Sequence, residues 1–184
     1  AGVNSINWAR VMAQTSYYFT AAAQLGGPDT PVGFSVPTGN FGDIFAGYVA
    51  AQMGLPIARL MIATNVNDIL ARVMQTGICE TENVIATSSP SMDIQVSSNF
   101  ERLLFELTRR DAPRVSGLMD ALARDGRFEM AGDEVALMSA LFDAARVDED
   151  QTQKTMRDVL KRFDMQIDPH TAVGLAAARQ IGKS

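Results

Sequence analysis

The first apolar stretch of the chain has the length and the periodic pattern of a helix. Asn4 or Ser5 can cap its beginning, and the pattern continues to about Leu25. The sequence Gly26-Gly27-Pro28 then predicts the end of this helix, because glycine favours a helix terminus and proline cannot continue a helix.

The next residues predict a strand, a buried helix and a second strand. Val32–Val36 and Arg59–Ala63 are short apolar runs typical of buried strands, and residues 44–53 are apolar on all sides, as in a buried helix. Residues 65–67 can open a further helix that ends near Gly77. A strand, a helix and a strand in this order form a βαβ unit, which predicts a parallel sheet and an α/β fold.

Polar residues become frequent after residue 97, and the pattern becomes mainly helical. Ser98 and Glu101 have the spacing of a capping box, in which the hydroxyl and the carboxylate each satisfy a main-chain amide at the start of a helix. Asp168-Pro169 predicts another helix start, as an N-cap followed by proline at the first helical position. Between these two starts we expect three more helices, at about 113–124, 134–145 and 151–163.

Charge is distributed unevenly between the two parts of the chain. The chain has 184 residues with 16 basic and 21 acidic side chains, and only nine of these charged residues precede residue 101. All three lysines, Lys154, Lys161 and Lys183, lie in the second part. A hundred residues with so little charge predict an interior region that is covered on several sides, so we expect the chain to be a piece of something larger.

The overall composition argues against several functional classes. The net charge of −5 leaves no positive field for a nucleic-acid partner, and no apolar run reaches the roughly 18 residues that span a membrane. The first residues lack the pattern of a signal peptide. The single cysteine, Cys79, cannot form an intramolecular disulfide and suits a reducing compartment, so we expect a cytoplasmic location. No cluster has metal-ligand spacing, so no metal site is predicted.

The strongest candidate for a binding site is the glycine-rich turn between the first strand and the buried helix, which comprises Gly39, Asn40, Phe41, Gly42 and Asp43. It follows the carboxyl end of a parallel strand, where open α/β sheets bind ligands. Its glycines let main-chain amides approach an anion, and the helix N-terminus adds partial positive charge. The turn is neither a Walker loop nor a dinucleotide fingerprint. A phosphate site and a purely structural turn are equally compatible with the spacing.

A second group of polar residues lies on the first turns of the first helix and comprises Asn4, Ser5, Asn7 and Arg10. These residues can cap the helix and leave one solvated arginine. Alternatively they form an anion site, because Arg10 is one of few arginines in this half of the chain.

Six blocks of sequence occur in an order that matches one enzyme family. They are NSINWAR at 4–10, VPTGNFGDI at 36–44, ATNVNDIL at 63–70, PSMDI at 90–94, SSNFERL at 97–103 and DPHTAVG at 168–174. Together these blocks closely resemble the threonine synthases of bacteria and fungi, and they span essentially the whole chain.

The resemblance implies a pyridoxal 5'-phosphate enzyme of fold type II, the tryptophan-synthase-β fold group, with a three-layer α/β/α cofactor domain. Such an enzyme converts O-phosphohomoserine and water into threonine and phosphate. In this family the turn resembling Gly39 to Asp43 wraps the cofactor phosphate. The resemblance also implies that Asn4, Ser5, Asn7 and Arg10 lie on the substrate side of the pocket.

The chain departs from the family in one respect. The lysine that holds the cofactor as a Schiff base lies upstream of the block at Asn4 in this family, and Lys154, Lys161 and Lys183 match no such motif. We therefore expect a central-to-C-terminal fragment that is inactive without the N-terminal part of the enzyme and contains no catalytic residue. We expect residues 1–100 to belong to the cofactor domain, 101–167 to form a charged helical segment and 168–184 to return to the α/β core.

Two alternatives remain open on the sequence. One is a non-catalytic module that binds a phosphate-bearing ligand or another protein. The other is a serine or threonine dehydratase of the same fold group.

Overall fold

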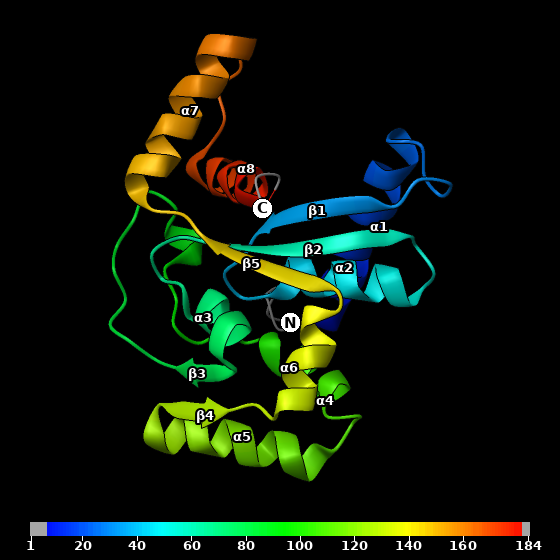
Figure 1. The fold of residues 1–184 in the computed structure, drawn as a ribbon, viewed down its shortest axis with the longest axis vertical. Helices are drawn as coiled ribbons and strands as arrows, with labels where there is room; N and C mark the ends of the chain where they lie inside the picture. The colour runs from blue at the N-terminus through cyan, green and yellow to red at the C-terminus, as the bar shows by residue number, and fades with distance from the viewer. Residues whose placement is uncertain (1–6, 182–184) are drawn as a thin grey trace.

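The computed structural model describes residues 7–181. Three parallel strands in the order β1-β2-β5 form its main sheet (Figure 1). Their bounds are Val32–Pro37 for β1, Ile57–Thr64 for β2 and Phe142–Arg146 for β5. The first two strands and the helix between them are the predicted βαβ unit, and the parallel pairing that this unit implies is confirmed.

Both faces of the sheet are buried, which explains why β2 is apolar at consecutive positions. Leu60 and Ile62 pack into the larger apolar cluster, and the alternate residues Met61 and Ala63 pack into a smaller cluster under α8. Helix α8 covers one face of the sheet, whereas α2 and α3 cover the other and α1 packs on α2 (Figure 1). The bounds of these helices are Trp8–Gln24 for α1, Gly42–Gln52 for α2, Ile69–Thr76 for α3 and Pro169–Ile181 for α8.

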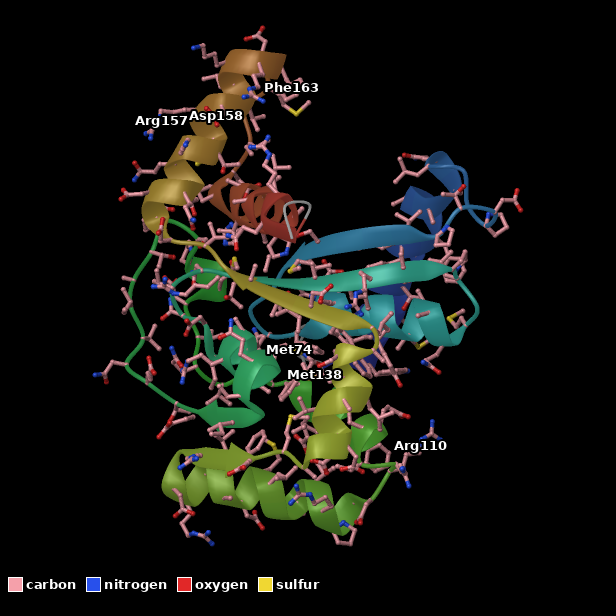
Figure 2. The ribbon with its side chains drawn as sticks, viewed as in Figure 1. Met74, Arg110, Met138, Arg157, Asp158 and Phe163 are labelled. Atoms are coloured by element: carbon pink, nitrogen blue, oxygen red, sulfur yellow. The ribbon has the colours of Figure 1, made fainter. Side chains whose placement is uncertain are left out.

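A second, smaller unit lies beyond α3, and its helices were predicted whereas its two strands were not. Its two strands pair antiparallel although almost fifty residues separate them in the chain. Met74 of α3 and Met138 of α6 (Figure 2) belong to the apolar cluster that connects the sheet to this unit, and the Met138 side chain is 1% exposed. The elements of the unit are β3 (Ile78–Glu80), α4 (Phe100–Leu107), α5 (Ala112–Asp125), β4 (Arg127–Glu129) and α6 (Gly132–Ser139).

The helix predicted at 134–145 is wrong in its second half. Helix α6 ends at Ser139, and residues 142–146 form β5, which pairs with β2. The exposed edge of β2 provides main-chain partners for this segment, so pairing overrides the helix propensity of its alanines. The charged part of the chain therefore contributes a strand to the main sheet before α7 (Glu149–Phe163) begins.

The described residues contain no helix that is long and apolar enough to cross a membrane. Within the same residues, no group of three histidine, cysteine, aspartate or glutamate side chains is arranged to hold a metal ion.

Candidate functional site

The predicted binding turn lies at the carboxyl end of β1, where Thr38 to Phe41 lead into α2. The short 3-10 helix η1 (Pro90–Met92) packs closely against this turn. A Cβ on Gly39 would collide with the carbonyl oxygen of Ser91, so only glycine fits this position. The close approach of these two segments fixes the path of the loop.

Phe41 adopts an unusual backbone conformation at the start of α2. Its φ is 63°, in the left-handed region that costs a non-glycine residue about 1–3 kcal/mol. The Phe41 ring is 1% exposed and makes an edge contact with Phe100 at 5.3 Å between ring centroids. Burial of the ring offsets the backbone strain. The Phe41 side chain thus anchors the loop, and only its main chain is available to a ligand.

In this loop the main-chain carbonyls of Gly39 and Asn40 have hydrogen-bond partners, whereas the N–H groups of residues 40–43 have none among the described residues. Ser97 Oγ donates to the Gly39 carbonyl at 2.8 Å, and Asn99 donates to the Asn40 carbonyl from its main-chain N at 3.1 Å and its Nδ2 at 2.9 Å. In contrast, within residues 7–181 no hydrogen bond uses the N–H groups of residues 40–43 as donors. A row of free N–H groups at a helix N-terminus favours an anion.

The polar residues before α4 support this loop instead of capping their own helix, so the predicted capping box at Ser98 and Glu101 is wrong. The N-cap of α4 is Asn99, and no side chain caps the helix. The hydroxyl of Ser98 is buried and has no hydrogen-bond partner among the described residues. Pairing with the loop holds Ser97 and Asn99 in place, which shifts the start of the helix.

A cavity of about 170 Å³ opens over the loop and contains Arg10, Gln14 and Ser91 as well as the loop residues. The structure thereby brings Arg10 and the turn together, although they are distant in sequence. Because a water molecule occupies about 30 Å³, the cavity has room for a tetrahedral oxyanion. The arginine side chain and the free N–H groups are both donors suited to that charge.

The other members of the first polar group lie elsewhere. Asn7 caps α1, where its Oδ1 accepts a hydrogen bond from the Ala9 main-chain N at 3.0 Å. It does not line the cavity over the loop. Asn4 and Ser5 lie outside the described residues. A role for these three residues in substrate binding stays a prediction.

Asp43 is the one acidic side chain in the first turn of α2. Burial raises the pKa of its carboxyl, while a hydrogen bond from Tyr18 and the charge of Arg10 act in the opposite direction. The Asp43 side chain is therefore a poor ligand for an anion, and its main-chain N–H is the group that can bind one.

The loop after β2 is built differently, from side chains that bind one another. Asn65 Nδ2 donates to Asp93 Oδ1 at 2.8 Å, to Thr87 Oγ1 at 2.9 Å and to Ser89 Oγ at 3.0 Å. Asn65 Oδ1 accepts from the main chain of Asn67 at 2.9 Å. Asn65 is 1% exposed, so this network closes the carboxyl end of β2.

A hydrogen bond connects α8 to η1, whose residue Ser91 lines the cavity. The main-chain N of Ser91 donates to Nε2 of His170 at 3.3 Å, and Nδ1 of His170 lies 3.1 Å from Asp168 Oδ1. With Nε2 as the acceptor of this bond, Nδ1 is the ring nitrogen that can donate to Asp168 Oδ1. The predicted N-cap is confirmed, since Asp168 Oδ1 accepts from the main-chain N of His170 at 2.8 Å.

Sequence reasoning missed Gln14 and Ser91 as residues that line the cavity, and Tyr18 as a contact of Asp43. Gln14 and Tyr18 follow Arg10 at intervals of four, which places all three on one face of α1. That spacing was available in the sequence, whereas the position of Ser91 depends on how a distant loop packs.

Comparisons with known proteins show which family the chain resembles. The chain is 50% identical to threonine synthase from Pseudomonas aeruginosa over 182 residues, which covers 99% of this chain and 39% of that protein. The structure matches a PLP-bound threonine synthase from Brucella melitensis with a TM-score of 0.96 and 55% identity, covering 98% of this chain and 39% of that one. No family model matches the chain. The chain thus spans about two fifths of the length of the relatives it matches, and its resemblance to threonine synthases is confirmed.

More distant structures support the fold alone. A serine racemase from maize matches with a TM-score of 0.59 at 17% identity, over 92% of this chain and 42% of that one. The predicted α/β architecture of fold type II is confirmed.

Proposed function

We propose that this chain is part of a threonine synthase and that its loop from Gly39 to Asp43 holds the phosphate of pyridoxal 5'-phosphate. The row of free N–H groups at residues 40–43 carries this proposal, because it lies in a chain that is 50% identical to a threonine synthase. The complete enzyme would convert O-phosphohomoserine and water into threonine and phosphate in the cytoplasm.

The residues of the cavity have distinct roles in this function. The N–H groups of the loop bind phosphate oxygens, and Gly39 lets η1 pack against the loop so that its shape is fixed. Arg10 also lines the cavity and adds positive charge to it. When bound, pyridoxal phosphate supplies the means to withdraw electrons from the substrate carbon.

We propose that the lysine that binds the cofactor comes from another part of the enzyme. Among the described residues, no lysine lines the cavity over the loop. Lys154 and Lys161 lie on α7, and Lys154 lines a separate cavity between α7 and α8. This arrangement supports the proposal that the remaining polypeptide supplies the Schiff-base lysine.

Exposed apolar surface also supports the proposal that the remaining polypeptide of the enzyme packs against this chain. On α1, Met12 is 58% exposed and Tyr17 is 62% exposed. A cleft of about 640 Å³ between α7 and α8 is lined by Phe163 and Met165, and Figure 2 shows Phe163 near the end of α7 that lies away from the sheet. Large apolar surfaces of this kind mark interaction sites, so we propose that the rest of the enzyme covers them.

The function can be tested with the full-length protein that contains this segment. We expect it to bind pyridoxal 5'-phosphate much more tightly than pyridoxal, which lacks the phosphate, and to release inorganic phosphate and threonine from O-phosphohomoserine. Conversion of threonine or serine to a 2-oxo acid, without turnover of O-phosphohomoserine, would instead identify a dehydratase. Binding of inorganic phosphate without any turnover would indicate a non-catalytic module.

A further inference from the structure

Tyr18 is a buried side chain that has no role in the function proposed above. It is 4% exposed, and its ring makes an edge contact with Phe34 at 4.8 Å between centroids. The ring lies directly over α2 at Gly47, where an added Cβ would come within 2.6 Å of it. Gly47 therefore permits a close approach that brings the tyrosine hydroxyl to the first turn of α2.

The hydroxyl of Tyr18 contacts Asp43, the last residue of the loop from Gly39 to Asp43. It donates to the main-chain carbonyl of Asp43 at 2.9 Å, and it lies 3.4 Å from Oδ1 of the Asp43 carboxyl. Burial and the nearby Asp43 together raise the pKa of Tyr18 far above its usual value, so the hydroxyl keeps its proton. The hydroxyl has one proton, which the carbonyl and the carboxylate of Asp43 share, so the contact connects α1 to both the main chain and the side chain of Asp43.

The position of the Asp43 carboxyl matters because it belongs to the loop that binds an anion. A carboxylate that turned toward the free N–H groups of residues 40–43 would accept hydrogen bonds from them, as carboxylates do at helix N-termini. It would then occupy the donors that a phosphate needs and would repel the phosphate charge. Something must hold this carboxyl aside.

We propose that Tyr18 is a positioning residue for the phosphate loop, which acts by holding the Asp43 carboxyl against α1 and away from the free N–H groups. This inference rests on the proposed function and deepens it, because it explains how an acidic residue is tolerated in an anion-binding turn. Arg10 and Gln14, two turns and one turn earlier on α1, line the same cavity and complete this wall.

The test compares two ligands that differ only in the phosphate. In the full-length protein, Tyr18→Phe should lower the affinity for pyridoxal 5'-phosphate by roughly five- to tenfold, the range expected when one ordinary hydrogen bond is lost. The affinity for pyridoxal should stay unchanged. Tyr17→Phe is the matched control, since Tyr17 is the neighbouring tyrosine on α1 and is 62% exposed.

A second substitution shows whether Tyr18 acts through Asp43. A neutral amide at position 43 carries no charge that repels phosphate, so Asp43→Asn in the Tyr18→Phe background should restore the affinity for pyridoxal 5'-phosphate. A purely structural role of Tyr18 would not be rescued in this way. If Tyr18→Phe does not fold, Gly47→Ala provides a second route, because it displaces the Tyr18 ring without removing its hydroxyl.

The outcomes separate this inference from the function on which it rests. If the wild-type protein binds pyridoxal as tightly as pyridoxal 5'-phosphate, the phosphate loop itself is misassigned and both proposals fail. If the wild-type protein prefers pyridoxal 5'-phosphate but Tyr18→Phe leaves that preference unchanged, weakens both ligands equally or is not rescued by Asp43→Asn, only the positioning role of Tyr18 is overturned.

Discussion

The loops that follow β1 and β2 begin at the same edge of the sheet, and both are rich in polar groups. Their hydrogen bonds, however, are arranged in opposite ways. After β1, the carbonyls of Gly39 and Asn40 accept hydrogen bonds, and the N–H groups of residues 40–43 have no partner among the described residues. After β2, the side chains of Asn65 and Asn67 bond to the segment from Ile85 to Asp93.

This difference separates a binding site from a structural network. Polar composition alone does not distinguish the two loops, because asparagine and aspartate occur in both. The two loops differ in whether their hydrogen-bond donors already have partners within the protein. Buried polar groups that bind one another stabilise the fold and leave no donor for a ligand. Free donors of one kind, gathered around a cavity, are what an anion requires.

The largest effect on stability is expected in the loop after β2, whose polar side chains bind one another. Asn65→Ala removes the hydrogen bonds that Asn65 Nδ2 donates to Asp93, Thr87 and Ser89 and leaves the carboxylate of Asp93 without one of its donors. We expect the free energy of unfolding to fall by about 3 kcal/mol, as for a broken buried network with a charged member. Urea unfolding of the full-length protein without cofactor would measure the loss.

A matched control exists in the same segment. Asn83 is exposed, so Asn83→Ala should change the free energy of unfolding by less than about 0.5 kcal/mol. Equal losses in the two variants would show that the network around Asn65 contributes little and that the two loops differ less than their hydrogen bonds indicate.

In the loop after β1, a substitution should lower the affinity for the ligand more than it lowers the free energy of unfolding. Gly39→Ala introduces a Cβ that collides with the Ser91 carbonyl, so the loop must shift relative to η1. We expect the affinity for pyridoxal 5'-phosphate to fall by tenfold or more, which corresponds to about 1.4 kcal/mol, with a smaller effect on pyridoxal.

Gly117→Ala is the control for this substitution, because a Cβ at Gly117 in α5 meets no atom within 4 Å. It should leave both affinities unchanged. An unaltered preference for the phosphate-bearing ligand in Gly39→Ala would mean that the anion binds elsewhere.

The sequence predicted the parts of the molecule that depend on local pattern. The apolar runs at Val32–Val36 and Arg59–Ala63 lie within β1 and β2, and the glycine-rich turn lies between β1 and α2 as expected. These features follow from apolar periodicity and from turn residues, which are encoded within a few positions.

The features that sequence reasoning missed depend on distant contacts. Residues 142–146 became a strand because the edge of β2 was available, and Ser97 and Asn99 support the loop at Gly39 instead of capping a helix. The contact between Tyr18 and Asp43 requires α1 to pack across α2 at a glycine. No local pattern encodes which segments will meet, so these contacts could not be predicted from one sequence.

The smallest effect is expected at a contact that serves both loops. Asp168 caps α8 and orients His170, whose Nε2 accepts the N–H of Ser91, and the 3-10 turn around Ser91 lies beside Gly39 and continues to Asp93. Asp168→Ala should lower the free energy of unfolding near neutral pH by about 1 kcal/mol, as for the loss of an N-cap.

This loss should depend on pH in a defined direction. Hydrogen bonds from Thr171 first, and from His170, lower the pKa of Asp168 to about 2 from the model-compound value of 3.8. A group whose pKa is lower in the folded state stabilises the fold above the unfolded pKa and loses this contribution as the pH falls from 3.8 to about 2. Because the Asp168 side chain is 59% exposed, solvent screening keeps the effect small.

The measurement follows the difference in unfolding free energy between the wild-type protein and Asp168→Ala from pH 6 downward. The difference should stay constant to about pH 4 and shrink below it. Asp168→Asn is the control, because asparagine caps a helix about as well as aspartate and does not titrate. A difference that persists unchanged to about pH 3 would show that the cap acts through its shape alone. The coupling of α8 to the two loops would then not depend on the charge of Asp168.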